Sequence, residues 1–383
     1  QPFNAPTGVY NEIRSHCVYS SVMTGIMNST FRKQAGLTRQ STLKSVSRFL
    51  LLFSILLTPL TVAASPLFDD ESILEVELTG PISTLYENRR EEPREQLPFT
   101  LVSEGVEHEI KVRVRGKSRV EFCQFPPLRL NFKKGEVDGT VFAGQDKLKL
   151  VTQCNLGQNA ETDVLEEYAA YRIFNELTDL SFRVRLLHIH FQDTGDGVKG
   201  LEQPRYGFLI EPIKHLAERN GGMPVEEPGV ALKWLEPEYA ALMYLHQYLI
   251  GNTDWSLAAA RGEEVCCHNV TLIKIDSMLN PVPFDFDMSG LVNAQYARPH
   301  PNIDSISRVT QRLYRGYCTD PAILRDTIQQ VAGKKEDIVR VIDNLPLLKP
   351  SKKEYKIDFL EKALKATNKE EKLIDLFEDR CLG

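Results

Sequence analysis

The sequence has no excess of positive charge. Its 46 Lys and Arg residues are outnumbered by 52 Asp and Glu residues, which gives a net charge of −6 at pH 7. Six of the basic residues and one of the acidic residues lie in residues 1–64, so the remainder carries 40 against 51, a net charge of −11. A protein that binds nucleic-acid phosphates normally shows the opposite balance. We therefore expect no nucleic-acid partner.

Long hydrophobic runs are also scarce. One run, Phe49–Leu60, follows a basic stretch and precedes T-V-A-A-S-P, which is the order of a secretory signal peptide. We expect this signal peptide to span residues 27–64, and residues 1–26 to be upstream read-through that is not native. The whole apolar segment covers only 16 residues and contains Pro59, so it is short for a membrane helix. The chain is predicted to be exported to the periplasm or beyond, with no stable membrane span after cleavage.

Spaced cysteine pairs are missing as well. The chain has seven cysteines, and six follow the signal peptide. An even number in an oxidising compartment favours disulfides, although the sequence does not give their pairing. Cys266 and Cys267 precede His268, but zinc sites use spacings such as C-x2-C, which this chain lacks. Disulfide bonding is therefore the better interpretation of these cysteines.

The region from residue 65 to 211 has the patterns of a β-rich domain with one long helix. Short alternating segments of apolar residues predict strands, and a 3.6-residue apolar stripe predicts a helix. A charged stretch, Glu87–Gln96, is expected to be a solvated loop. The predicted strands are Ile73–Leu78, Ile110–Val114, Leu128–Phe132, Val184–Phe191 and Tyr206–Ile213, and the predicted helix is Asp163–Leu177.

Cations gather on these predicted strands. Val112–Arg119 reads V-R-V-R-G-K-S-R, a strand that enters a glycine turn, where Arg115 or Lys117 could cradle a phosphate. The alternative is that the same residues form an exposed basic hairpin turn that binds nothing. The next strand and the one after it offer further candidates for a phosphate-binding cation, namely Arg129, Lys133, Lys147 and Lys149, with Asn131 on the same face as the first two.

The region from residue 212 to 383 is predicted to be mainly helical. An amphipathic helix, Pro237–Gly251, leads directly into the loop that carries Asp254. Further helices are predicted at Pro321–Ala332, Glu336–Leu345 and Lys353–Leu376.

The stretch between the first of these helices and Gly290 carries three polar signals. We predict a hairpin of Val270–Ile275 and Val282–Phe286, with its turn at Asn280-Pro281. Such a hairpin brings Asn269 and Asp285 together, next to the loop of Asp254. An Asp, an Asn and a second Asp in this order are typical of a phosphoryl-transfer site that holds Mg²⁺. Asp and Asn are also ordinary turn residues, so a purely structural role is the alternative.

Asp285 and Asp287 strengthen the case for a metal. They lie among Phe284, Phe286 and Met288, where a buried and unpaired carboxylate is costly. In a strand they share one face, and two carboxylates on one face repel unless a cation lies between them. We therefore expect both to act as metal ligands.

Three glutamates are further candidates for the nucleotide site. Glu166 and Glu167 lie early in the predicted helix Asp163–Leu177, where one of them could pair with the phosphate-binding cation. Acidic residues in a first turn also suit the helix dipole, so a structural role remains open. Glu211 ends a predicted apolar strand that could lead into an adenine-binding hinge, although a buried edge strand would look the same.

From about Val112 to Ala297 the chain resembles the CotH family of secreted and spore-coat kinase-like proteins. The motifs that carry this resemblance are R-G-K-S (115–118, including Ser118), P-P-L-R-L-N-F-K-K (126–134), F-A-G-Q-D-K-L-K-L (142–150), L-E-E-Y-A-A-Y-R-I-F-N-E-L (165–177), Y-G-F-L-I-E (206–211), L-I-G-N-T-D-W-S (249–256), H-N (268–269) and P-F-D-F-D (283–287). The family usually has a Lys where this chain has Asn131.

The resemblance implies a two-lobed α+β fold of the atypical protein kinase type, with a β-rich N-lobe and a mainly helical C-lobe. It implies that Asp254 is the catalytic residue, that Asn269 and Asp285 bind Mg²⁺ or Mn²⁺, and that Asp287 is the second acidic residue. The implied activity is transfer of the ATP γ-phosphoryl group to a hydroxyl of a secreted or cell-envelope protein. Two alternatives remain: a non-catalytic kinase-like binding module, and a metal-dependent phosphodiesterase that uses Asp254, His268, Asp285 and Asp287.

Overall fold

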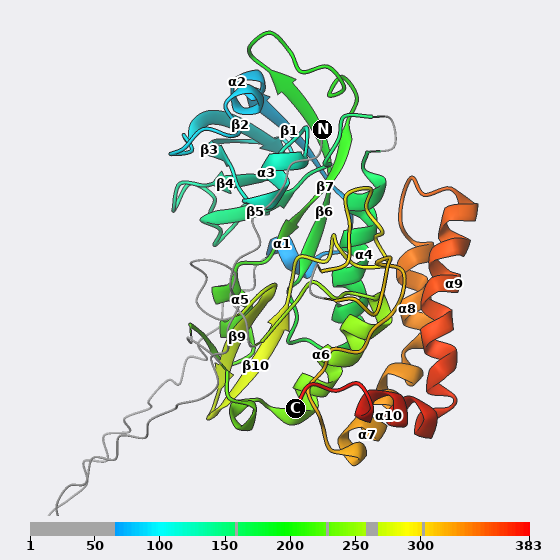
Figure 1. The fold of residues 1–383 in the computed structure, drawn as a ribbon. Coiled ribbons are helices and arrows are strands. Elements are labelled where there is room, and N and C mark those ends of the chain that lie inside the picture. The colour runs from blue at the N-terminus through cyan, green and yellow to red at the C-terminus, as the bar shows by residue number, and fades with distance from the viewer. Residues whose placement is uncertain (1–65, 158–159, 227–229, 258–266, 301–302) are drawn as a thin grey trace, which may run out of the picture. The chain divides into compact units, whose positions relative to one another are not determined.

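The computed structural model describes residues 66–157, 160–226, 230–257, 267–300 and 303–383. These residues belong to one compact unit, Leu60–Gly383. The expected signal peptide and the segment before it lie outside the described residues. The fold is mixed α+β, with strands concentrated in the N-terminal part and helices in the C-terminal part, as the sequence predicts (Figure 1).

The N-terminal strands form a closed barrel in the order β1-β2-β3-β4-β5-β7-β6. Neighbouring strands are antiparallel except β1 and β6, which pair in parallel and close the barrel. The strand at residues 97–103 was not predicted, although it alternates. The strand bounds are β1 Leu74–Gly80, β2 Leu97–Ser103, β3 Val106–Val114, β4 Leu128–Asn131, β5 Lys147–Val151, β6 Val184–Asp193 and β7 Arg205–Ile210.

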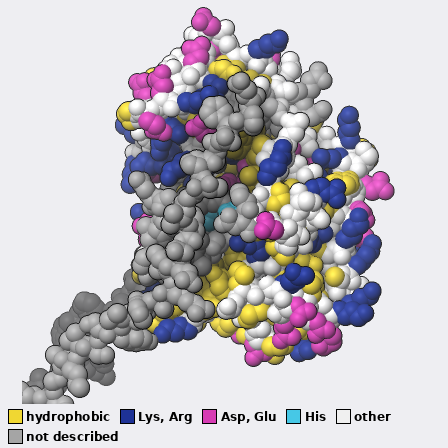
Figure 2. Space-filling view, viewed as in Figure 1, with side chains coloured by type: hydrophobic (Ala, Val, Ile, Leu, Met, Phe, Trp, Pro, Cys, Tyr) yellow, Lys and Arg dark blue, Asp and Glu magenta, His cyan; other side chains and the backbone are white. Residues whose placement is uncertain are grey.

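Alternation along the strands separates an apolar barrel interior from a basic outer face. On β4, Leu128 and Leu130 are buried in the interior, whereas Arg129 between them faces outward and is half-buried. This is the period-two pattern expected of a half-exposed sheet. In the space-filling view, Lys and Arg side chains colour the edge of the barrel that β3 and β4 form (Figure 2).

The remaining elements are helices and a small second sheet of order β10-β9-β8. Its strands are β8 Met223–Val225, β9 Val270–Ile275 and β10 Met278–Pro283. The helices are α1 Pro66–Asp69, α2 Ile82–Glu87, α3 Ser118–Phe122, α4 Thr162–Leu177, α5 Ile213–Arg219, η1 Leu232–Trp234 (3-10), α6 Pro237–Ile250, α7 Pro321–Gly333, α8 Lys335–Asp343, α9 Pro350–Thr367 and α10 Glu370–Glu378.

The structure corrects two details of the helix and turn predictions. The helix predicted at 353–376 is two helices, because Asn368 and Lys369 break it and Lys369 leaves helical geometry with φ −121° and ψ 53°. The break lets α10 bury Phe377 against the core. The glycine turn after β3 leads into the short helix α3 rather than into a hairpin, with Gly116 in the left-handed region at φ 86°.

The hairpin is also shifted from its prediction. Its turn lies at Asp276 and the following Ser, not at Asn280-Pro281, and β10 ends before Asp285. Pro281 pairs with Leu272 inside the ladder. A proline is tolerated there because β10 is an edge strand of its sheet. Asp285 and Asp287 therefore do not share a strand face but follow the strand in a loop.

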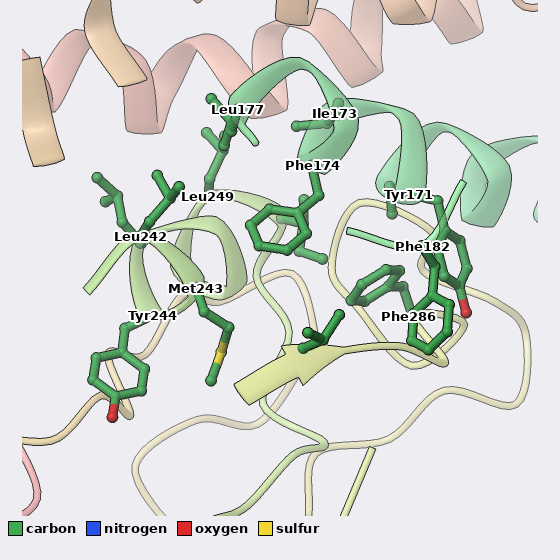
Figure 3. Packing of buried hydrophobic residues seen from close by; sticks show 14 of the residues in the cluster. Tyr171, Ile173, Phe174, Leu177, Phe182, Leu242, Met243, Tyr244, Leu249 and Phe286 are labelled. Carbon is green, nitrogen blue, oxygen red and sulfur yellow. The ribbon is translucent and has the colours of Figure 1, made fainter. Parts of the chain in front are cut away.

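Helix α4 joins the barrel to the helical part. Phe174 packs against His246 of α6 with ring centroids 4.5 Å apart. Tyr171 and Phe286 form an edge-to-face pair with centroids 4.6 Å apart (Figure 3). On the other side, Tyr171 packs against Phe208 of β7 at 5.6 Å. One buried helix thus fixes the barrel strands relative to the loop that follows β10.

Two disulfides join cysteines that are both among the described residues. Cys123, at the end of α3, is bonded to Cys154, just after β5, and Cys318 is bonded to Cys381 near the C-terminus. Cys267 is disulfide-bonded as well. None of the helices in the described residues has both the length and the apolar character needed to cross a membrane.

Candidate functional site

The loop that carries Asp254 begins at a glycine that ends α6. Gly251 adopts φ 67°, and its N–H is bonded to the last turn of the helix. Its carbonyl accepts a hydrogen bond from Gly290 at 3.0 Å, and Leu291 donates to Ile250 at 2.9 Å. Gly290 also packs closely against the backbone of Val309. A Cβ at position 290 would lie only 2.5 Å from the Val309 carbonyl oxygen, so this position requires glycine. These bonds hold the loop after α6 beside the loop after β10.

Asp254 is held by its neighbours on both sides. Asn252 accepts a hydrogen bond from the Asp254 N–H at 3.0 Å, which closes a small turn. The Asn269 side-chain Nδ2 donates to the Asp254 carbonyl at 2.7 Å and to Oδ2 at 3.1 Å. His268 places Nε2 3.3 Å from the other carboxylate oxygen, Oδ1. The carboxylate of Asp254 therefore has a fixed orientation.

Backbone pairing brings Asn269 into place. Ser256 and His268 form an antiparallel bridge with hydrogen bonds of 3.0 and 2.9 Å. The Asn269 carbonyl accepts from Phe284 N–H at 3.0 Å, so Asn269 faces the chain just before Asp285. Three segments that are distant in sequence thus meet at one end of the hairpin.

Asn269 and Asp285 share an uncommon backbone conformation. Their φ angles are 53° and 63°, in the left-handed region that only Gly, Asn and Asp adopt at low cost. The N–H of Asp285 donates to the hydroxyl of Tyr171 at 2.9 Å. Phe286, fully buried next to it, anchors the loop in the core. This conformation turns the chain sharply at Asn269 and at Asp285, on either side of the hairpin.

Asp287 completes a group of interacting carboxylates. It is buried and accepts a hydrogen bond from the Tyr296 hydroxyl at 2.9 Å. The pKa of Asp287 is raised to about 7, chiefly by burial and by the nearby charge of Asp285. Asp254 also raises this pKa, whereas Arg119 and the hydrogen bond from Tyr296 lower it. Asp254 and Asp285 thus both lie close enough to repel a negative charge on Asp287.

Cations of the barrel face this acidic group. In the registers of β3, β4 and β5, Arg113 lies opposite Arg129, and Arg129 lies opposite Lys149; we call these three side chains the cation row. Lys149 places Nζ 5.2 Å from the centre of the Phe284 ring, next to Asp285. The pKa of Lys149 is lowered to about 8, chiefly by burial and also by Arg115 and Arg129, while Asp285 acts in the opposite direction. Burial also lowers the pKa of Arg115, again against the effect of Asp285.

A second buried network, between α3 and α4, lies next to Asp287. Arg119 of α3 donates to the Thr152 carbonyl at 2.8 Å and lies 3.6 Å from a carboxylate oxygen of Glu167. Burial and Asp287 raise the pKa of Glu167. Burial disfavours the charge on Arg119, but Tyr296, Glu167 and the two aspartates Asp285 and Asp287 raise its pKa overall. Glu167, one of the two helix glutamates that could pair with a phosphate-binding cation, thus faces Arg119.

Other predicted site residues lie elsewhere. Glu166 is buried against α9 and pairs with Lys356 at 2.8 Å and Lys352 at 3.3 Å. Glu211 pairs with Arg219 at 2.8 Å. Lys133 is exposed and pairs with Glu136. Two further residues, Lys117 and Ser118, lie at the start of α3; Lys117 is exposed, and the side chain of Ser118 is outside the described part.

Sequence analysis missed three side chains of this arrangement, namely Arg119, Tyr171 and Tyr296. Arg119 belongs to the basic stretch after β3, where the sequence predicts a turn, and nothing in that stretch distinguishes it from the other cations. Tyr171 was predicted only as part of an apolar stripe, and its hydroxyl on that stripe is the signal that could have marked it. Tyr296 lies in a loop without periodicity, and no signal in the sequence marks it.

Comparisons with known proteins give little beyond this geometry. No family model matches the chain, and no curated protein matches it. Among solved structures, the chain is similar to the crystal structure of a Helicobacter pylori proinflammatory kinase, CtkA, with 12% sequence identity and a TM-score of 0.34. That similarity covers 66% of this chain and 93% of the other.

Proposed function

We propose that this chain is an exported, metal-dependent phosphotransferase with a kinase-like two-lobed fold. It would transfer the γ-phosphoryl group of ATP to a hydroxyl of a protein acceptor. The observation that carries the proposal is the meeting of two opposite sets of charges. Asp254, Asn269 and Asp285 converge at the end of the hairpin, and Lys149 of the barrel lies over Phe284 beside them.

The cation row supports an anionic ligand. Like charges directly opposite one another in a sheet destabilise it. Within the described residues, no ion pair neutralises Arg113, Arg129 or Lys149. A triphosphate supplies the negative charge that this face lacks. The charge of Asp285 raises the pKa of both Lys149 and Arg115, so both cations lie near the acidic group. These two residues are the best placed to contact a bound triphosphate.

The acidic group fits a hard divalent cation. Asp285 and Asp254 raise the pKa of the buried Asp287, so the three carboxylates repel one another as they stand. Asn269 uses its side-chain nitrogen on Asp254 and so can offer its amide oxygen to a cation. We assign Asn269 and Asp285 as ligands of Mg²⁺ or Mn²⁺, with Asp287 as the second carboxylate. When bound, the ion would neutralise charge on the phosphate oxygens.

Asp254 is assigned the role of orienting the acceptor. In the transfer, the acceptor oxygen forms a bond to the γ-phosphorus, the bond from that phosphorus to the β,γ-bridging oxygen breaks, and ADP leaves. The hydroxyl proton passes to the Asp254 carboxylate, which Asn269 holds in position. The disulfides fit an oxidising compartment, so we propose a secreted or cell-envelope protein as acceptor.

The decisive test is incorporation of labelled γ-phosphate from Mg²⁺-ATP into the protein itself or an added acceptor protein. We expect incorporation by the wild type and a loss of about 10²–10⁴-fold in Asp254→Asn, the range for a lost general base. Asp276→Asn is the matched control, since Asp276 lies exposed at the opposite end of the same hairpin. Equal incorporation by Asp254→Asn and wild type would contradict the assignment.

One contact favours a second candidate function. The 3.3 Å approach of His268 to Asp254 resembles a histidine and aspartate pair in a metal-dependent phosphodiesterase. Hydrolysis of a simple phosphodiester without added nucleotide, lost in His268→Ala, would support that hydrolase. ATP binding without transfer or hydrolysis would instead indicate a kinase-like binding module.

A further inference from the structure

The seam that closes the barrel carries two histidines, each opposite a glutamate. β1 and β6 pair in parallel, with Glu75 opposite His188 and Glu77 opposite His190. Leu187 and Ile189 are buried in the barrel interior, so the two histidines between and after them face outward. Residues two apart on a strand point to the same side. His188 and His190 therefore stand side by side next to Glu75 on the outer surface.

These three side chains are close enough to share an ion. Each offers one ligand atom, and the three atoms lie within 4.8 Å of one another. His188 Nδ1 lies 2.9 Å from a carboxylate oxygen of Glu75, and the two imidazole rings are 5.8 Å apart. Tyr206 of β7 packs against the His188 ring at 4.8 Å, which limits the orientations that this ring can take. The group is thus partly organised without a ligand.

We propose that Glu75, His188 and His190 bind a first-row transition-metal ion, with Zn²⁺ as the reference case. Imidazole nitrogens with one carboxylate are the donors that Zn²⁺ accepts, at bond lengths of about 2.0–2.2 Å. Such bonds place ligand atoms about 3–4 Å apart in a tetrahedral site. The ligand atoms lie within 4.8 Å of one another, and the exposed side chains of Glu75 and His190 can change rotamer to approach that range. Three protein ligands leave one position for water.

This site is separate in chemistry from the acidic group after the hairpin. Asp254, Asn269 and Asp285 offer only oxygen, which suits Mg²⁺, whereas the histidines select softer ions. It also has a structural consequence of its own. An ion held by one residue of β1 and two of β6 ties the first strand to the strand that closes the barrel. Because such an ion binds only the folded state, it stabilises the barrel.

The test is titration of the full chain, purified with chelator, with Zn²⁺, followed by calorimetry and by the visible absorption of a Co²⁺ replacement. We expect the wild type to bind one more equivalent than His190→Ala, or to bind it at least about tenfold more tightly. His190→Ala leaves the contact between His188 and Glu75 intact. His190→Gln is a second variant of the same ligand, and His215→Ala of α5 is a control that should bind like wild type.

The outcomes separate the possibilities. Loss of the equivalent and of the Co²⁺ absorption in both His190 variants, with melting temperatures in chelator unchanged, supports the site. Identical Zn²⁺ binding by wild type and both His190 variants, or no Zn²⁺ binding by wild type, would overturn it and leave only an ordinary surface contact of His188 with Glu75. Asp285→Ala should keep the Zn²⁺ equivalent, so failure here is distinguishable from failure of the phosphotransferase proposal.

Discussion

The amide of Asn269 donates to Asp254 twice, to its carbonyl at 2.7 Å and to its carboxylate at 3.1 Å. One side chain thereby fixes the loop after α6 and the orientation of the acid that we assign to the acceptor. The same residue directly precedes β9, so its side chain links the hairpin to the loop. Several expected effects of substitution depend on this pair.

Asn269→Ala should abolish transfer while leaving most of the fold intact. It removes both hydrogen bonds to Asp254 and one ligand assigned to the metal. It also places Ala at φ 53°, a strain of about 1–2 kcal/mol. Asn293→Ala is the matched control, because Asn293 has φ 51° but is exposed. We expect both variants to lose stability in urea, Asn269→Ala the more because it also removes two hydrogen bonds. A loss of transfer of about 100-fold or more is expected only for Asn269→Ala.

Nucleotide affinity should depend on the charge of Lys149. Its pKa of about 8 means that it is charged below this pH and neutral above it. Affinity for ATP should therefore be greatest below pH 8 and should weaken as the pH rises through this value. Lys149→Arg should bind ATP without this dependence, and Lys149→Met should bind weakly at every pH. Lys147→Met, on the same face of β5 but exposed, is the control that should keep both affinity and pH dependence.

His246 should make the protein sensitive to acid. It is fully buried, and its Nε2 bonds to the Ala170 carbonyl at 3.1 Å. Burial lowers its pKa from 6.5 to about 3, against the effect of the bond to Ala170. The unfolded chain thus takes up this proton at a higher pH than the folded one. Its contribution to stability is complete above pH 6.5 and is lost as the pH falls toward 3, at about 1.4 kcal/mol per pH unit.

This contribution can be isolated with His246→Gln, which keeps an N–H donor but does not titrate. Urea unfolding at pH 7.5 and at pH 5 measures the difference. Wild type should lose about 2 kcal/mol more than the variant between these values. Equal losses in the two proteins would show that His246 does not set the acid limit.

The two assigned disulfides should differ in their effect on the site. Replacing both Cys123 and Cys154 with Ser should cost about 3–4 kcal/mol, since the bond closes a 31-residue span. Because this bond fixes α3, which carries Arg119, ATP affinity should fall as well. The Cys318 and Cys381 pair, replaced in the same way, should lower stability by a similar amount without changing ATP affinity. Calorimetric unfolding and ATP titration of both double variants check this.

The sequence was sufficient for elements whose patterns are local. Alternation predicted β9 residue for residue, and the apolar stripe placed α4 within a residue of its start and at its end. The turn of the hairpin was misplaced because Asn280-Pro281 is a strong local turn signal. In the structure this dipeptide lies in the edge strand β10, where a proline without an N–H does not remove a hydrogen bond between strands. The sequence does not show that β10 is an edge strand, because that depends on the order of the strands in the sheet.

Contacts distant in sequence were beyond prediction. Glu166 and Glu167 are adjacent and equally acidic, yet one faces Lys356 of α9 and the other faces Arg119. Which of them turns toward the site depends on the rotation of α4 about its axis, and packing of Tyr171 and Phe174 determines that. The cation row, likewise, exists only through the register of β3, β4 and β5.

The central claim is that Asp285 and the cations of the barrel share one nucleotide and its metal ion. Thermal unfolding with Mg²⁺-ATP tests it most directly, with Asp276→Ala as a control because Asp276 also has a positive φ, 52°, but lies at the far end of the hairpin. At about 100 times the dissociation constant, binding adds about 2.7 kcal/mol of stability, a rise of several degrees. We predict this Mg²⁺-dependent rise in wild type and Asp276→Ala and its absence in Asp285→Ala. No rise in wild type, or an undiminished rise in Asp285→Ala, would contradict the account.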